Sequence, residues 1–326
     1  MSNNHVKISV APMMDWTDRH CRYFHRLISP NAILYSEMVT TGALLHGDAE
    51  RFLRFNTQEH PVTLQLGGSD PYELAKCTEM AAEAGYDEVN LNCGCPSDRV
   101  QKGKIGAILM TEPDLVATCY AEMSKVSALP VTIKCRTGID EQDDFAFLDV
   151  FVDKIADKGC TEFIIHARKA WLNGLSPKQN REIPPLDYER VYNVKEKYPQ
   201  LCISLNGGLK TLEDIEENAP RFDGLMIGRE TYSNPYFLAE IEKGIFKTAN
   251  LRSREEIARI MMQYAAEQNK LYGTPIKSIT RHILGLYHGQ KGAKAWKRTL
   301  STLPYEKGAN ESVIEQALLA VKTAAS

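Results

Sequence analysis

Short apolar runs rich in β-branched residues alternate with longer stretches of helical periodicity through the first 230 residues. The sequence predicts eight strands, at Lys7–Met13, Ile33–Met38, Val62–Gly68, Glu88–Cys93, Val131–Arg136, Glu162–Arg168, Cys202–Gly208 and Gly224–Glu230. Between most of them, apolar residues recur every three or four positions, which predicts helices such as Pro71–Ala84, Pro113–Val126 and Phe145–Lys158. Strands alternating with helices pair in parallel, so eight units predict an α/β fold of the (β/α)8 TIM-barrel type. A doubly wound sheet is the alternative, but no Gly-x-Gly-x-x-Gly turn follows the first strand.

The pattern changes after Tyr232, where no further strand is predicted. Helical periodicity marks four segments, at Ser253–Tyr272, Ile276–Gln290, Ala293–Leu300 and Glu311–Thr323. We therefore predict two domains: a catalytic barrel over residues 1–243 and a smaller all-helical domain over residues 244–326.

Basic residues are concentrated toward the C-terminus. The 326-residue chain has a formal net charge of −3, which alone argues against nucleic acid as a partner. Residues 244–326 nevertheless contain 13 lysines and arginines against 6 acidic residues, whereas the first 243 residues contain 26 against 36. This asymmetry predicts a polyanionic partner at the helical domain. The alternative is a solvated helical surface with a chance excess of positive charge.

Composition argues against membrane, export and metal roles. There is no run of about 18 apolar residues, and Met1–Val6 is polar, unlike a secretory signal. The eight cysteines lack zinc spacing, and a single residue separates Cys93 from Cys95, which is poor geometry for a disulfide. We expect a reduced, cytoplasmic, metal-free monomer.

Polar residues gather at the predicted C-terminal ends of the strands, where barrel enzymes place their active sites. Among them are Gln65, Asn90, Asn92, Cys95, Lys134, Arg136, His166, Arg168 and Asn206. After strands seven and eight, Gly207-Gly208 and Gly228-Arg229 can bring backbone amides and a guanidinium to a phosphate. That phosphate could belong to a substrate or to a cofactor.

Lys134, His166 and Gln65 point toward a flavin. A fixed cation and an imidazole can stabilise negative charge on the N1/O2 side of a reduced isoalloxazine. The amide of Gln65 offers a donor and an acceptor to the polar edge of the ring. A buried ion pair for Lys134 and a satisfied core histidine for His166 are the structural alternatives.

Several longer motifs carry a family resemblance over essentially the whole chain. They are Ala11-Pro-Met, Leu64-Gln-Leu-Gly-Gly, Asn92-Cys-Gly-Cys-Pro-Ser-Asp-Arg-Val, His166-Ala-Arg-Lys-Ala-Trp, Asn206-Gly-Gly and Ile227-Gly-Arg. With them, the chain resembles the tRNA-dihydrouridine synthases, FMN-dependent barrel enzymes that use NADPH to reduce the C5=C6 bond of uridine in tRNA. The runs beginning at Asp15, Glu37 and Leu175 resemble the A subfamily, which acts at positions 20 and 20a of the D-loop.

The resemblance implies a role for each matching residue. FMN contacts fall on Pro12, Met13, Met14, Gln65, Lys134, His166, Asn206, Gly207, Gly208, Gly228 and Arg229. The catalytic acid falls on Cys95, which would protonate C5 after hydride transfer from flavin N5 to C6. A thiol of ordinary pKa, about 8.5, is mostly protonated at neutral pH and can act in this way. Asn92 would orient the uracil or the cysteine loop, and Cys93, an unusual residue in this motif, could compete with Cys95 for alkylating probes.

The expected tRNA contacts lie in two basic groups. Arg168, Lys178 and Arg181 fall in the long loop after strand six, and Lys178 and Arg181 resemble family positions that set the orientation of the tRNA. In the helical domain, the expected contacts Lys294, Lys297 and Arg298 form a basic cluster around Trp296 together with Lys291. At helical spacing Lys291, Lys294 and Arg298 can share a face that suits RNA phosphates. Trp296 itself is more typical of a core residue than of a stacking platform.

Two other functions are compatible with parts of the sequence. A flavin barrel that reduces a free pyrimidine or another small molecule would explain the predicted FMN residues but not the basic helical domain. An RNA-binding protein on a degenerate barrel would explain the basic segment and would bind no flavin.

Overall fold

The computed structural model describes residues 6–97 and 103–325 and divides the chain into two compact units. The first comprises the residues up to Met14 together with Ile33–Gly228, and the second comprises Asp15–Ala32 and the residues from Arg229 onward. This division differs from the predicted boundary at residue 244. Asp15–Ala32 belongs to the second unit because side chains of this segment bond to residues of the C-terminal helices.

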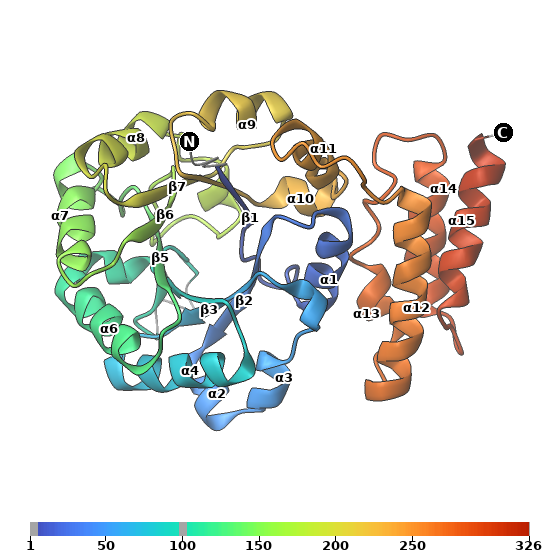
Figure 1. The fold of residues 1–326 in the computed structure, drawn as a ribbon, viewed down its shortest axis with the longest axis horizontal. Helices are drawn as coiled ribbons and strands as arrows, with labels where there is room; N and C mark the ends of the chain where they lie inside the picture. The colour runs from blue at the N-terminus through green and yellow to red at the C-terminus, as the bar shows by residue number, and fades with distance from the viewer. Residues whose placement is uncertain (1–5, 98–102, 326) are drawn as a thin grey trace. The chain divides into compact units, whose positions relative to one another are not determined.

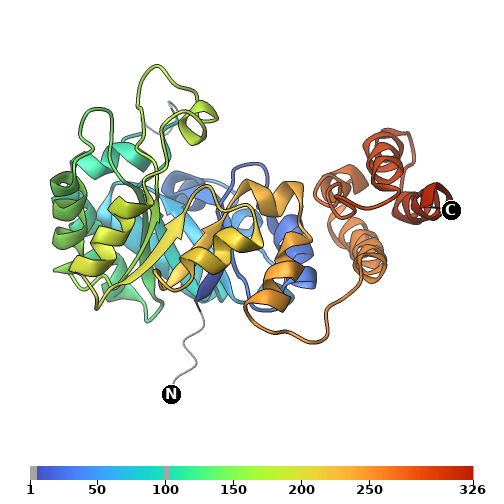
Figure 2. The same cartoon turned by 90° about the horizontal axis from the view of Figure 1, so that it is seen from above.

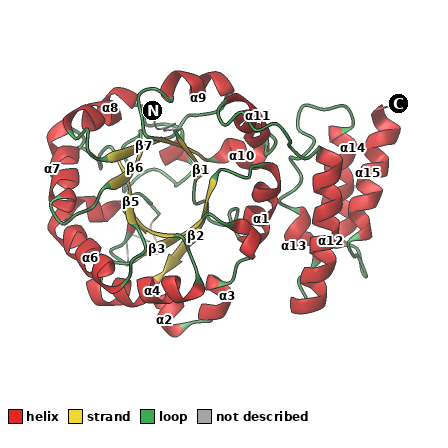
Figure 3. Cartoon of the chain, in the orientation of Figure 1, coloured by secondary structure: helices red, strands yellow, loops and turns green. Residues whose placement is uncertain are grey.

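Eight parallel strands form a closed barrel in the first unit (Figures 1 and 3). They are β1 (Lys7–Val10), β2 (Ile33–Thr40), β3 (Val62–Gly67), β4 (Glu88–Asn92), β5 (Val131–Arg136), β6 (Glu162–His166), β7 (Cys202–Asn206) and β8 (Gly224–Ile227). Each strand pairs with the next, and β8 closes the barrel on β1, with Val10 opposite Ile227. The predicted (β/α)8 fold is therefore confirmed.

Helices surround these strands on the outside of the barrel (Figure 1). They are α2 (Thr41–His46), α3 (Ala49–Leu53), α4 (Pro71–Ala84), α6 (Pro113–Val126), α7 (Phe145–Ala156), α8 (Tyr188–Lys197) and α9 (Leu212–Asn218), with 3-10 turns η1 (Thr57–Glu59), η2 (Gly106–Thr111) and η3 (Gln179–Arg181). Their starts follow from the sequence: the side chain of Asp70 caps α4 ahead of Pro71, and that of Asp144 caps α7.

The barrel interior is part apolar and part polar. Ala11, directly after β1, forms a small apolar cluster with Tyr35 of β2, Ile164 of β6 and Met226 of β8. Every second residue of β4 (Glu88, Asn90 and Asn92) is polar, and successive residues of a strand point to opposite sides of the sheet. The polar set therefore shares one face of β4, and the hydroxyl of Tyr35 donates to Glu88 across the interior (3.0 Å).

The described residues of the second unit form helices, turns and loops but no strand. It contains α1 (Arg19–Ile28), α10 (Arg229–Ser233), α11 (Phe237–Gly244), α12 (Arg254–Tyr272), α13 (Ile276–Thr280), α14 (Ala293–Thr302), η4 (Leu303–Tyr305) and α15 (Ser312–Ala325). Helix α15 packs against both α12 and α14, and the three appear together in Figure 2.

The prediction of one helix over Ile276–Gln290 is wrong, because α13 ends at Thr280 and turns follow. Tertiary contacts override helical periodicity here. A Cβ added at Gly285 would lie 2.5 Å from the carbonyl oxygen of Ser233, so the chain passes very close to that backbone. The indole N–H of Trp296 in α14 donates to the carbonyl of Ile283 (2.9 Å). That carbonyl therefore bonds to α14 and not to a backbone N–H of a continued helix.

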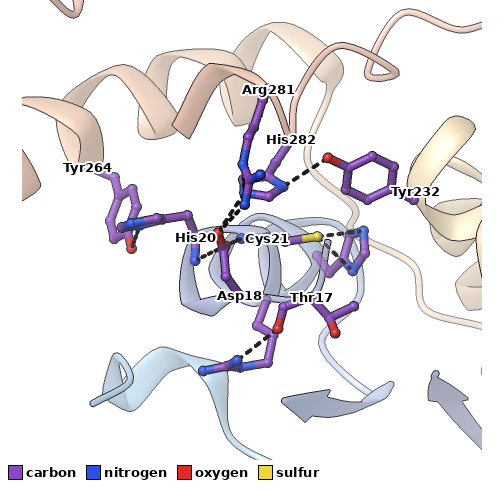
Figure 4. Close-up of polar contacts among 10 residues, drawn as sticks. Thr17, Asp18, His20, Cys21, Tyr232, Tyr264, Arg281 and His282 are labelled. Carbon is purple, nitrogen blue, oxygen red and sulfur yellow. Dashed lines mark hydrogen bonds and ion pairs between the residues drawn. The ribbon is translucent and has the colours of Figure 1, made fainter. Parts of the chain in front are cut away.

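Asp18 joins α1 to the segment after α13 within this unit (Figure 4). Its carboxylate accepts from the backbone N–H groups of His20 (2.9 Å) and Cys21 (3.0 Å), which caps α1. The same carboxylate contacts Arg281 (2.8 Å) and His282 (2.9 Å). Burial is the largest single influence on Asp18 and opposes its charged form. The hydrogen bond with His282, the charges of His282 and His20 and the backbone N–H of Cys21 together outweigh burial and hold the pKa of this carboxyl well below its usual range.

Candidate active site

The strand ends bring the polar residues of neighbouring strands side by side at one edge of the barrel. Asn92 of β4 lies opposite Lys134 of β5 in the strand register. His166 of β6 lies between Arg136 of β5 and Asn206 of β7. Because the strands are parallel, these five residues form a continuous arc at their C-terminal ends, the edge at which barrels carry out chemistry.

Lys134 is the cation at the centre of this arc. Its ammonium donates to Asn206 Oδ1 (3.0 Å), and Asn206 in turn donates to the carbonyl of Met226 (2.7 Å). Burial, reinforced by the charge of Arg136, lowers the pKa of Lys134 to about 8. No carboxylate among the described residues forms an ion pair with Lys134, so the alternative of a buried ion pair does not hold.

His166 lies beside this cation as a neutral imidazole. Burial and the charges of Arg136 and Lys134 keep its pKa well below the usual value. Within residues 6–97 and 103–325, the ring of His166 has no hydrogen-bond partner, so the alternative of a satisfied core histidine does not hold either. A neutral imidazole without a partner is available to hydrogen-bond a ligand.

Gly207 and Gly208 continue β7 in the left-handed region, with φ of 111° and 78°. A Cβ at Gly207 would lie 2.9 Å from the His166 ring, and one at Gly208 would lie 2.5 Å from the hydroxyl of Tyr188. Only glycine fits both the backbone conformation and this space. Gly228 follows β8 and has more room, since an added Cβ would meet only Ala11 at 3.8 Å.

The remaining predicted cofactor residues lie after β1 and β8. Pro12 and Met13 are partly exposed and Met14 is exposed in the loop that follows β1. Arg229 is the first residue of α10 and belongs to the helical unit.

The two cysteines after β4 lie in different environments. Cys93 is fully buried, its backbone N–H donates to the carbonyl of Lys134 (2.8 Å), and burial raises its pKa well above the usual value. Cys95 is partly exposed in the loop that begins at Gly94. Burial of the Cys93 thiol, where the strand pairing extends past Asn92, argues against the expectation that Cys93 competes for alkylating probes. Residues 98–102 of the same motif lie outside the described residues.

Asn92 and Arg136 hold the cysteine loop. Asn92 Oδ1 accepts from the backbone N–H groups of Gly94 and Cys95, both at 3.0 Å. The guanidinium of Arg136 donates to the carbonyl of Gly94 (2.7 Å), and to those of Lys169 and Asn180 (both 3.1 Å) in the loop after β6. The sequence predicted no specific role for Arg136 or Asn90; their polar side chains at inward positions of β5 and β4 were the available signal.

The basic loop after β6 is organised by the buried side chain of Asn180. Its amide donates to the carbonyl of Trp171 (2.8 Å) and accepts from the backbone N–H of the same residue (2.7 Å). Arg168 donates to the carbonyl of Pro184 at the other end of the loop. Lys178 precedes η3 and Arg181 is its last residue; both are exposed, so the loop presents these two cations to solvent.

In the helical unit, Lys294, Lys297 and Arg298 are exposed on α14, and no carboxylate of the described chain pairs with any of them. Trp296 is fully buried and its indole N–H is bonded to Ile283, which confirms the prediction of a core residue. Free surface cations of this kind are available to bind phosphates.

The structure shows no disulfide among the eight cysteines, all of which lie in the described residues. No described set of three or more His, Cys, Asp or Glu side chains is arranged to hold a metal ion. None of the described helices combines the length and the apolar character needed to cross a membrane.

A closed parallel barrel with a cationic arc and a thiol loop at its strand ends is the framework of a barrel oxidoreductase, and comparison with known proteins gives the family. Residues 9–323 match the family described as Dihydrouridine synthase (Dus), so the chain belongs to this family. It is 55% identical over 316 residues to a protein of Shewanella oneidensis called tRNA-dihydrouridine(20/20a) synthase, covering 97% of this chain and 94% of that one. Proteins with the same name from Vibrio cholerae and Escherichia coli are 54% and 52% identical over 314 residues, covering 96% of this chain and 95% and 94% of theirs. The family resemblance of the sequence is thereby confirmed.

Proposed function

We propose that this protein reduces the C5=C6 bond of uridine to 5,6-dihydrouridine at positions 20 and 20a of the tRNA D-loop. A hydride is added at C6 and a proton at C5, so the uracil gains two electrons and two hydrogens. The likeness to tRNA-dihydrouridine(20/20a) synthases over nearly the full length of both chains carries the choice of substrate. A reductase of free pyrimidines has no comparable support.

The residues at the strand ends fit FMN as the cofactor, which would supply the hydride after reduction by NADPH. Lys134, a cation without a carboxylate partner among the described residues, suits the N1/O2 edge of the isoalloxazine. The unpartnered ring of His166 suits the same polar edge. Gly207 and Gly208, where a side chain would clash, leave room for a phosphate to approach backbone amides. Further contacts are proposed for Pro12, Met13, Met14, Gln65, Asn206 and Gly228.

Cys95 is proposed as the general acid. It is the partly exposed thiol of the loop after β4, whereas Cys93 is buried. Charge develops at C5 and O4 of the uracil as C6 accepts the hydride, and a proton from the Cys95 thiol neutralises it. Asn92 keeps the loop in place through two backbone N–H groups and retains amide N–H capacity to orient the uracil.

Two basic groups are proposed as tRNA contacts, one in each unit. Arg168, Lys178 and Arg181 belong to the loop after β6, and Lys294, Lys297 and Arg298 belong to α14. Positive side chains that contact phosphates contribute most of the salt-dependent affinity for nucleic acid. The barrel would then carry the chemistry and the helical unit would contribute to tRNA docking.

The deciding experiment is a turnover assay with unmodified tRNA transcript, FMN and NADPH, followed by mapping of dihydrouridine along the tRNA. We expect dihydrouridine at positions 20 and 20a only. Modification at other positions would keep the chemistry and overturn the choice of site. Reduction of free uridine at a comparable rate, or flavin turnover without any dihydrouridine in tRNA, would overturn the substrate.

A further inference from the structure

A continuous line of hydrogen bonds crosses the barrel interior from β5 to β3. The hydroxyl of Thr132 donates to Glu88 Oε1 (2.9 Å), and the side-chain amide of Asn90 donates to Thr132 Oγ1 (2.9 Å). Gln65 Nε2 donates to Asn90 Oδ1 (2.8 Å). Four polar side chains from three adjacent strands are thus joined by three bonds of good length.

The line continues from Gln65 to the loop that carries Cys95. Asn92 Nδ2 donates to Gln65 Oε1 (2.8 Å), and Asn92 Oδ1 accepts from the N–H groups of Gly94 and Cys95 (both 3.0 Å). Each amide in the line, from Asn90 to Gln65 to Asn92, accepts on one side and donates on the other. We call this set of residues, Glu88, Thr132, Asn90, Gln65 and Asn92, the amide relay.

Both ends of the amide relay fix its direction. At the loop end, the backbone N–H groups of Gly94 and Cys95 can only donate, so Asn92 must present its oxygen to them. At the other end, Oε1 of Glu88 accepts from three hydroxyls, those of Thr132, Tyr35 (3.0 Å) and Thr63 (3.3 Å). If the side-chain amide of Asn90 were turned around, those of Gln65 and Asn92 would have to turn as well. The NH2 group of Asn92 would then face the backbone N–H groups of Gly94 and Cys95, and no hydrogen bond could form there.

Burial makes each of these bonds difficult to replace. Asn90 is 0% exposed, and Gln65 and Thr132 are each 1% exposed. A buried donor or acceptor that loses its partner has no water to take its place, so the whole line must shift or remain partly unsatisfied. The orientation of the Asn92 amide therefore depends on residues that are too deep to touch a substrate.

We infer that Asn90 and Thr132 are positioning residues for uridine reduction: through Gln65 and Asn92 they fix the loop that holds Cys95. The inference rests on the proposed function of Cys95 as the proton donor. Proton transfer depends on the distance and alignment of the donor, so a loop that samples several positions lowers the rate of the chemical step while tRNA affinity stays unchanged.

Thr132→Val and Thr132→Ser form a matched pair for the test. Valine has nearly the shape of threonine but cannot link Asn90 to Glu88, whereas serine keeps the hydroxyl. In the free protein, we expect hydrogen exchange at the Gly94 and Cys95 amides to be about three- to tenfold faster in Thr132→Val than in wild type. Thr132→Ser should restore it, and exchange in β8 should stay the same in all three proteins.

The second readout is the single-turnover rate at which saturating tRNA oxidises the reduced flavin. It should fall by about the same factor in Thr132→Val, with unchanged KM for tRNA and unchanged reduction by NADPH. Asn90→Leu, a substitution of similar volume, should have an equal or larger effect. Equal exchange in Thr132→Val and wild type, or faster exchange throughout the barrel, would overturn the inference. A wild-type protein that makes no dihydrouridine yet shows the exchange contrast would overturn the proposed function alone.

Discussion

Burial decides how reactive each cysteine near the barrel strands can be. Cys93 and Cys95 are two positions apart, yet one thiol is fully buried and the other partly exposed. Cys202 is also partly exposed, but burial of its thiol raises its pKa to about 12. Because the thiolate is the reactive form, an exposed position alone does not make a cysteine reactive.

Alkylation tests this difference directly. With limited iodoacetamide at pH 8, we expect Cys95 to be modified at least about tenfold faster than Cys93 or Cys202, because it combines exposure with a loop position. Peptide mass mapping over time gives the rate at each cysteine. Modification of Cys93 at the rate of Cys95 would mean that β4 opens far more readily than its pairing indicates.

Removal of the Cys95 thiol should separate the two half-reactions. Cys95→Ala should retain FMN and its reduction by NADPH but lose uridine reduction by about 10²-fold or more, the usual contribution of a general acid. Stopped-flow absorbance of the flavin measures both steps. Cys93→Ala is the matched control and should keep both rates, since the buried thiol has no part in the mechanism. Loss of flavin from Cys95→Ala would show that Cys95 has been assigned the wrong role.

For single residues, the sequence predicted which polar side chains lie at the strand ends better than it predicted their bonding partners. The rule that barrel sites lie at the strand ends locates Lys134 and His166. Only the structure shows that, among the described residues, Lys134 has no carboxylate partner and the ring of His166 has no hydrogen-bond partner. No role was predicted for Asn90 or Arg136 because they act through other residues: an amide bonded to Gln65 and a guanidinium bonded to the carbonyl of Gly94. Such roles depend on which strands become neighbours, which a single sequence does not reveal.

At the scale of elements, helix α1 carries buried histidines that make the helical unit sensitive to acid. Burial is the largest influence on both His20 and His25, and it lowers their pKa values to about 4 and about 3. Nδ1 of His20 is bonded to the hydroxyl of Tyr264 (2.8 Å), and Nε2 of His25 to the carbonyl of Thr231 (3.0 Å). In the unfolded chain both histidines titrate near 6.5, so the unfolded state binds more protons as the pH falls below that value.

The contribution of these two histidines to the free energy of unfolding should therefore be fully present above about pH 6.5 and decrease as the pH drops toward 4. The His20 contribution lost between pH 7 and pH 5 is about 2 kcal/mol, from a folded pKa of about 4. Urea unfolding measures the free energy of unfolding at pH 7 and at pH 5. The loss between these two pH values should be smaller in His20→Gln than in wild type by about this amount. His288→Gln, which replaces an exposed histidine of the same unit, should keep the wild-type difference. An unchanged difference in His20→Gln would mean that His20 is protonated in the folded state.

The predicted elements were most accurate where pattern and packing agree. The helices Pro71–Ala84 and Pro113–Val126 were predicted to the residue, since proline starts each one and apolar spacing covers its length. Several strand ends were predicted too long: β8 stops at Ile227, not Glu230, and Arg229 already begins α10. The end of β5 was predicted to the residue, and β2 runs two residues further than predicted, to Thr40. Glycine-rich strand ends resemble strands in sequence, but the backbone leaves the sheet there to form the loops of the site.

At the scale of the whole molecule, the uneven charge gives a prediction for tRNA binding. The net charge is −3, yet α14 carries Lys294, Lys297 and Arg298 with no carboxylate partner among the described residues. The double variant Lys294→Glu and Lys297→Glu should weaken tRNA binding by about tenfold or more at low salt. The slope of log Kd against log salt should fall by about 2, one for each phosphate that the variant no longer neutralises. Titration of labelled tRNA at several salt concentrations measures both quantities.

A charge-matched control separates local binding from overall charge. Lys76→Glu with Lys158→Glu changes the net charge by the same amount on exposed residues of the barrel unit, one on α4 and one just after α7. If α14 contacts phosphates, this control should retain a salt slope close to wild type, and both doubles should oxidise NADPH at the wild-type rate without tRNA. Equal weakening in the two doubles would mean that long-range repulsion alone accounts for the weaker binding. The basic segment would then contribute to the field around the molecule, and the tRNA contacts would have to be sought on the loop after β6.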